Sequence, residues 1–179
     1  MATTTGLSWE AFLAAGKEGQ RWECIDGEVR FMSPTGSRHG REIHLIDRAL
    51  ARWEDQVKGW VCFSADVAFT MRDGSWLCPD AAVVRLDRYP AGIVPEGPTP
   101  FPPDVAFEVI SPSDLWADIQ RKRRIYSKNG VVHVWVDSAN RTIEVISPTR
   151  GSRTFAEGET AVIEELPGLK LDLFPAVTG

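Results

Sequence analysis

Two carboxylates lie where the sequence predicts buried strands. Glu108 interrupts the apolar run Val105–Ile110, and a carboxylate inside a buried strand costs several kcal/mol unless it is paired or bound to a metal. Asp80 follows Pro79 and precedes a second apolar run, Ala81–Val84. If these runs are neighbouring strands, both carboxylates can share one face, where each raises the pKa of the other unless a cation lies between them. Such oxygen ligands favour Mg²⁺ or Mn²⁺. The structural alternatives are a salt bridge from Glu108 to an arginine and a turn that ends at Asp80.

A lysine on the next predicted helix adds a third charge to this group. The helix is expected from about 114 to 129, and its inward stripe is predicted to be Leu115, Ile119 and Tyr126. Lys122 comes three residues after Ile119 and four before Tyr126, so its side chain should point into that stripe. It can extend to solvent, or it can reach over the C-terminal end of the Glu108 strand, where α/β proteins usually bind ligands.

The three charges together indicate metal-assisted phosphoryl chemistry. A metal would polarise the phosphate and lower the pKa of an attacking water, while Lys122 would orient that water or neutralise the charge that develops on the phosphate. A hydrolase that uses the two carboxylates directly as acid and base explains the pattern less well, because it leaves Lys122 without a role.

The elements that must position these groups alternate between strands and helices. Apolar residues at spacings of three and four predict a long amphipathic helix over 38–57, and a shorter helix is expected over 8–15. An Asp26-Gly27 turn predicts a hairpin over 21–32. Further strands are expected at 60–64, 66–71, 77–84, 104–110, 131–137 and 142–146, with short strands at 153–155, 161–163 and 169–171, and a surface loop at 85–103. Residues 104–136 form a βαβ unit with parallel strands. We therefore expect an α/β sandwich with a mixed central sheet flanked by helices.

Composition indicates one soluble globular domain over residues 1–179. The chain is 43% hydrophobic and 25% charged, without an apolar run of the roughly 20 residues that a membrane span needs. The first residues do not resemble a signal peptide, and three widely spaced cysteines are expected to be buried thiols in a reducing cytoplasm. The net charge of −5 argues against a nucleic-acid partner for the chain as a whole. Residues 117–130, however, carry five basic side chains against one acidic side chain, so a phosphate substrate is not excluded.

The ordered set of motifs resembles the PD-(D/E)XK nucleases, and more closely the bacterial restriction-type endonucleases of the Uma-two family. The resemblance runs from Trp22 to about Pro175. The motifs that carry it are WECIDGE (22–28), MSP (32–34), His39, Pro79-Asp80, EVISPS (108–113), Asp118 with Lys122 and Tyr126, Gly130-Val131, and VWVD (134–137).

The resemblance implies a restriction-endonuclease-like fold. It also implies an endonuclease that depends on Mg²⁺ or Mn²⁺ and acts on DNA, with RNA not excluded. The protein is then expected to be a homodimer. Asp80 and Glu108 would bind the metal, and Glu23 would complete the site. The usual motif has a lysine two residues after the glutamate, where this chain has Ile110, so the lysine is expected to have moved to Lys122. The alternative is a catalytically silent member of the fold that binds nucleic acid or a partner protein.

Four further residues are weaker candidates for the site. His39, near a helix N-terminus, can contact phosphate or simply be solvated. Asp118 is expected to hold Lys122 as its i,i+4 partner. Tyr126 is expected in the core, with its hydroxyl within reach of the site. Trp116 is the tryptophan expected to meet a nucleotide, whereas Trp22, Trp53 and Trp135 fit core positions.

Overall fold

The computed structural model describes residues 22–25, 27–31 and 36–175; the helix expected at 8–15 lies outside them. The described strands are β1 (Trp22–Ile25), β2 (Glu28–Phe31), β3 (Trp60–Ser64), β4 (Phe69–Thr70), β5 (Trp76–Leu77), β6 (Ala81–Arg85), β7 (Val105–Ile110), β8 (Val132–Asp137), β9 (Thr142–Ser147), β10 (Gly151–Phe155), β11 (Ala161–Val162) and β12 (Lys170–Leu171). The described helices are α2 (Ser37–Glu54) and α3 (Trp116–Lys128), with short 3₁₀ turns η1 (Leu86–Arg88) and η2 (Pro90–Gly92).

Within the described residues the strands form three sheets. The central sheet has the order β10-β9-β8-β7-β6-β3, the hairpin sheet has the order β2-β1-β5-β4, and β11 pairs with β12. In the central sheet β7 and β8 are parallel, and the pairs on either side are antiparallel. The mixed sheet and the parallel βαβ unit are thus as predicted.

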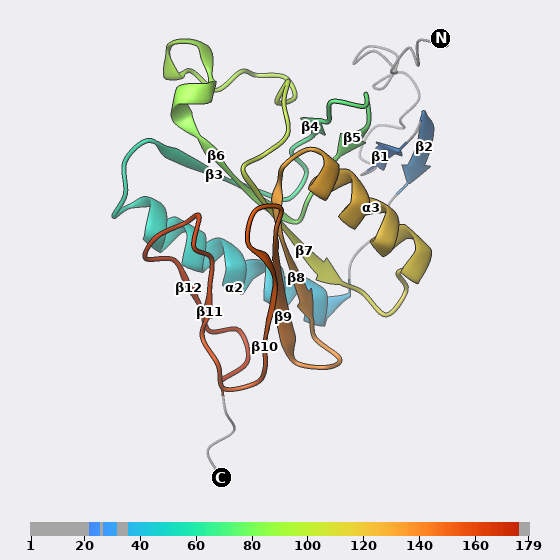
Figure 1. The fold of residues 1–179 in the computed structure, drawn as a ribbon, viewed down its shortest axis with the longest axis vertical. Helices are drawn as coiled ribbons and strands as arrows, with labels where there is room; N and C mark the ends of the chain where they lie inside the picture. Colours follow the sequence, from blue (N-terminus) through green and yellow to red (C-terminus); the bar gives the residue numbers. More distant parts are fainter. Residues whose placement is uncertain (1–21, 26, 32–35, 176–179) are drawn as a thin grey trace.

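The central sheet has a helix on each face (Figure 1). On one face, Ile46 and Leu50 of α2 pack against the odd-numbered residues of β7. On the other face, Ile119 and Tyr126 of α3 pack with Ala106 of β7. Because side chains alternate along a strand, Glu108 lies on the α3 side with Ala106. This alternation explains how one carboxylate can stand in a strand that is apolar on both faces.

One predicted strand is divided in two, and this division positions Asp80. The sequence predicts a continuous strand over 77–84, but β5 belongs to the hairpin sheet and β6 to the central sheet. Pro79 lies at the break and has no N–H to donate to a ladder. Since Ala81 pairs with Phe107, Asp80 comes next to Glu108 as the chain enters the central sheet.

Other boundaries also differ from the prediction. Helix α2 ends at Glu54 rather than at 57, and the strand expected over 66–71 is reduced to Phe69–Thr70. Leu115, predicted to face inward, is 67% exposed. It caps α3 in an extended conformation, so helical periodicity does not apply to it.

All three cysteines lie within the described residues. Cys24 and Cys78 are buried, Cys62 is partly buried, and none of the three forms a disulfide within the described residues. Burial raises the pKa of the Cys62 thiol to about 12.

Across the described residues, no helix has both the length and the apolar character needed to cross a membrane.

Candidate active site

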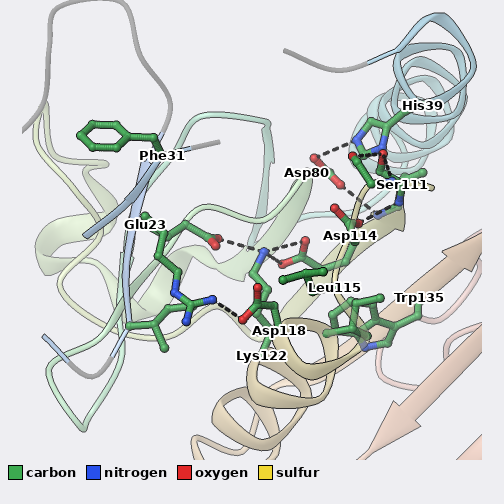
Figure 2. A pocket seen from close by; sticks show the side chains of 16 residues that line it. Glu23, Phe31, His39, Asp80, Ser111, Asp114, Leu115, Asp118, Lys122 and Trp135 are labelled. Atoms are coloured by element: carbon green, nitrogen blue, oxygen red, sulfur yellow. Dashed lines mark hydrogen bonds and ion pairs between the residues drawn. The ribbon is translucent and has the colours of Figure 1, made fainter. Parts of the chain in front are cut away.

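A pocket of about 340 Å³ opens where β7 ends, between α3, the hairpin sheet and the start of α2. It is lined by most of the residues that the sequence singles out, namely Glu23, His39, Asp80, Glu108, Asp118 and Lys122. Figure 2 shows Glu23, His39, Asp80 and Lys122 reaching the pocket from separate parts of the chain. Tyr126 lies beneath the pocket and is fully buried. Lining residues up to 112 positions apart in the sequence therefore meet at one sheet edge.

The ammonium of Lys122 joins two of the carboxylates. Its Nζ atom lies 2.9 Å from Glu23 Oε1 and 2.9 Å from Glu108 Oε1, and it donates a hydrogen bond to Glu108 Oε2 at 3.0 Å. Burial alone would lower the pKa of Lys122, but the charges of Glu108 and Glu23 outweigh burial and raise it. Lys122 is therefore held as a cation inside the pocket, and only 8% of the residue is exposed.

Glu108 is held from two sides. The Tyr126 hydroxyl donates to Glu108 Oε1 at 2.6 Å, and Lys122 contacts both oxygens of the same carboxylate. Burial, with further contributions from the charges of Asp80 and Glu23, raises the pKa of Glu108 to about 7, although Lys122 and Tyr126 oppose the shift. The carboxyl therefore lies in an environment that favours a nearby cation.

Asp80 is held by different partners. Its Oδ2 atom accepts a hydrogen bond from the Val109 N–H at 2.9 Å, and His39 Nε2 lies 3.4 Å from Oδ1. Burial would raise the pKa of Asp80, but the hydrogen bonds from His39 and Val109 and the charges of His39 and Lys122 lower it overall. Asp80 is thus kept ionised while Glu108 is pushed towards protonation, although the two are neighbours.

His39 is not a solvated histidine. Its side chain is 11% exposed, and it lies on the first turn of α2 facing Asp80. The other role considered for His39 from the sequence, a contact with phosphate, remains a prediction. Burial against a carboxylate gives the ring a position from which it can orient Asp80.

The expected pairing of Asp118 with Lys122 is wrong. Asp118 instead forms an ion pair with Arg30 of β2, while Lys122 turns inward to Glu23 and Glu108. Helical spacing brings Asp118 and Lys122 within reach, but the buried carboxylates compete more strongly for the ammonium. The Arg30–Asp118 pair instead ties the hairpin sheet to α3, at the wall of the pocket.

Backbone contacts at the pocket were not predicted from the sequence. Besides the Val109 N–H, the Cys78 N–H donates to Glu23 Oε1 at 3.0 Å, two residues before Asp80. No residue type signals such a contact. The loop after β7 also lines the pocket through Ser111, Ser113 and Asp114, and its SPS sequence was the available signal.

The donor atoms fit a hard divalent ion in chemical kind, because Glu23, Asp80 and Glu108 all present carboxylate oxygens. Among the residues that the structure describes, no three His, Cys, Asp or Glu side chains are already grouped as a metal centre. In the described arrangement, Lys122 is the cation that Glu23 and Glu108 share.

Comparison with known proteins defines the class of the fold. The mixed six-stranded sheet with a helix on each face is an α/β fold. A solved structure described as a putative nuclease belonging to DUF820, from Anabaena variabilis, matches with a TM-score of 0.78 and 19% sequence identity, over 92% of this chain and 96% of that one. At this identity the likeness shows the fold alone.

The family follows from a second comparison. The model of the Uma2 family, described as "Putative restriction endonuclease", matches residues 9–173. The chain belongs to the Uma2 family, which is the Uma-two family that its motifs resemble. No curated protein matches it.

Proposed function

We propose that this protein is a Mg²⁺-dependent endonuclease that hydrolyses phosphodiester bonds in DNA, and that Mn²⁺ can replace Mg²⁺. One observation carries the proposal: Asp80, Glu108 and Lys122 line one pocket in a chain of the Uma2 family. Asp80 and Glu108 would hold the ion, with Glu23 as a further ligand. When bound, the ion supplies a Lewis acid that polarises the phosphate and lowers the pKa of the attacking water.

The chain's own residues have separable tasks in this proposal. Lys122 orients the attacking water or neutralises the charge that develops on the phosphate. Tyr126, which donates to Glu108 Oε1, fixes that carboxylate, and His39 does the same for Asp80. Asp118 acts indirectly, because its ion pair with Arg30 holds the hairpin sheet against α3.

Nicking of DNA tests the proposal. Purified protein is incubated with supercoiled plasmid and with circular single-stranded DNA, with Mg²⁺, Mn²⁺ or EDTA. Cleavage is expected with either metal and not with EDTA, and Glu108→Gln should lower the rate on the order of a thousandfold. Asp104→Asn is the matched control, because Asp104 precedes the same strand at its other end and pairs with Arg88. Protein that cuts neither DNA nor RNA with any metal would refute the proposal.

A second candidate function is non-catalytic binding of nucleic acid or a partner protein. It is favoured by Ile110 at the usual lysine position and by the ion pairs that engage Lys122. Calorimetric titration with Mn²⁺ separates the two functions. Metal binding that Asp80→Asn abolishes supports the nuclease, whereas salt-sensitive DNA binding that ignores Asp80 and Glu108 supports the silent protein.

We further propose that the protein is a homodimer, because restriction-type nucleases commonly form dimers. Sedimentation equilibrium of the purified protein checks it: a mass near twice 19.9 kDa is expected, and a monomer at all concentrations would contradict it.

A further inference from the structure

Exposed apolar side chains gather at the mouth of the pocket. Among the described residues the large exposed hydrophobic side chains are Phe31, Ile93, Val94, Leu115, Trp116 and Val162. Phe31 and Leu115 line the pocket, and Trp116 follows Leu115 directly. These three, which we call the apolar rim, are 55%, 67% and 65% exposed respectively. The rest of the pocket is rich in charge. The rim side chains carry no carboxylate, so they do not supply oxygen ligands for a cation.

The rim approaches the pocket from two different elements. Phe31 ends β2, beside Arg30 and on the same hairpin as Glu23, whereas Leu115 and Trp116 begin α3. Figure 2 shows Phe31 and Leu115 separated by the charged side chains between them. A ligand that enters the pocket therefore meets an apolar surface on two sides of its lining.

Cations accompany the rim on both sides. Arg30 lines the pocket beside Phe31. The guanidinium of Arg123 lies 5.8 Å from the Trp116 ring centroid and 5.0 Å from that of Trp135, which also lines the pocket. Arg30 is paired with Asp118 and Arg123 with Glu144, so the match of the rim to a nucleotide lies in its exposed aromatic faces, on which bases stack.

The carboxylates themselves are recessed. Asp80 is 3% exposed and Glu108 is 5% exposed, so a phosphodiester reaches them only by entering the pocket. At about 340 Å³ the pocket is near the lower end of the size range of small-molecule sites. One nucleotide of a flexible strand suits such a space, whereas a base-paired duplex is too wide to enter it.

We propose that the apolar rim stacks unpaired bases, so that the substrate delivered to the pocket is single-stranded DNA or an unpaired stretch within a duplex. This inference deepens the proposed function and rests on it for the location of the scissile phosphate. Phe31 and Trp116 supply the stacking faces, and Leu115 adds an apolar surface at the pocket lining. Stacking has no base preference, because every base has a π-face.

Binding measured without metal tests the inference independently of cleavage. In EDTA, fluorescence anisotropy is recorded with a labelled single strand, a hairpin duplex containing that strand, and an abasic strand of equal length. We expect the single strand to bind more tightly than the duplex. Phe31→Ala and Trp116→Ala should each weaken single-strand binding on the order of tenfold. The abasic strand should bind weakly, and Trp116→Ala should not weaken it further.

The chain offers matched controls for these variants. Ile93, directly after η2, and Val162, on β11, are also exposed but lie outside β2 and the start of α3, which carry the rim, so Ile93→Ala and Val162→Ala should leave binding unchanged. Thermal unfolding of each variant checks that the fold is retained, as expected for exposed side chains.

Three outcomes would overturn the inference. The duplex could bind as tightly as the single strand, or the rim variants could bind like the wild type. Alternatively, sedimentation could show that rim variants turn a dimer into a monomer while oligonucleotide binding is unchanged, which would make the rim a contact between two copies. The proposed function fails separately: a protein that binds single strands through the rim yet never cleaves DNA retains the inference and loses the nuclease.

Discussion

Two polar clusters lie side by side between α3 and the central sheet, and they are built on different principles. The charged cluster consists of Glu23, Glu108, Lys122 and Tyr126. The neutral cluster consists of Ser127, His133 and Trp135. In the parallel register of β7 and β8, Glu108 is opposite Trp135 and Ala106 is opposite His133, so both clusters occupy one face of the sheet.

The polar groups of the neutral cluster form hydrogen bonds with one another. Trp135 Nε1–H donates to His133 Nδ1 at 2.7 Å, so a neutral His133 ring carries its proton on Nε2 and donates it to Ser127 Oγ at 3.0 Å. Burial, with a smaller contribution from Arg123, lowers the pKa of His133 to about 4. Both ring nitrogens are engaged and the ring is uncharged at neutral pH, so this cluster stabilises the fold without adding a charge.

The positive and negative charges of the charged cluster are unequal in number. Glu23 and Glu108, with Asp80 beside them, face the single ammonium of Lys122. The surplus is negative and opens into the pocket. An excess of buried charge does not stabilise a fold. We therefore assign the functional role to the charged cluster and a structural role to the neutral one. Tyr126 separates the two, because its ring stacks on His133 while its hydroxyl reaches Glu108.

The largest expected effect comes from removing the cation of the charged cluster. Lys122→Met leaves Glu23 and Glu108 buried without a counter-ion and should lower the free energy of unfolding at pH 7 by about 3–5 kcal/mol, besides abolishing nicking. Urea denaturation measures the first effect. Lys128→Met on the exposed side of the same helix is the control and should change stability by less than about 0.5 kcal/mol. Equal effects of Lys122→Met and Lys128→Met on stability would contradict the assignment of Lys122 as the counter-ion of the two buried glutamates.

The neutral cluster should be visible in the pH dependence of stability. The unfolded chain protonates His133 below about pH 6.5, whereas the folded protein resists protonation down to about pH 4. The unfolded state therefore binds more protons in this window, and stability falls as the pH decreases through it. The contribution is fully present above pH 6.5, and its loss by pH 4 amounts to about 3 kcal/mol.

His133→Gln isolates this contribution, because glutamine does not titrate. The difference in unfolding free energy between wild type and variant, measured by urea denaturation from pH 4 to pH 7, should follow the His133 titration. A constant difference across this range would show that the ring is not buried as a neutral group. Nicking by the variant, assayed at pH 8, should stay near the wild-type rate.

The smallest effect should separate the two clusters at adjacent residues. Tyr126→Phe removes one hydrogen bond to Glu108 and keeps the ring, so stability should fall by about 1.5–3 kcal/mol at most and nicking should fall on the order of tenfold. Ser127→Ala removes one hydrogen bond of the neutral cluster and should leave nicking unchanged. If Ser127→Ala slowed nicking as much as Tyr126→Phe, the division into a functional and a structural cluster would be wrong.

Local pattern predicted much of the fold and part of the site. The Asp26-Gly27 signal predicted the β1–β2 hairpin, and the apolar run around Glu108 predicted β7. The position of Lys122 within the α3 stripe predicted an inward side chain, and the residue is buried. Leu115 was misplaced because the same periodicity was extended one residue beyond the start of the helix.

Contacts between distant segments were beyond such patterns. Arg30 and Asp118 are 88 positions apart, and nothing in either neighbourhood indicates the other. Glu23 entered the site through the family resemblance rather than through its surroundings. The break at Pro79 also depends on competition between two sheets, which a single strand pattern does not represent.

The sequence by itself determined which charges stand in apolar surroundings, because burial follows from periodicity along one strand or one helix. It thereby selected Asp80, Glu108 and Lys122. Tertiary structure alone decided their partners: Lys122 with Glu23 and Glu108, Asp80 with the Val109 N–H and His39, and Asp118 with Arg30. The physical reason is that burial is a local property, whereas pairing depends on which carboxylate is nearest in space and least solvated once the hairpin sheet, α2 and α3 meet at the end of β7.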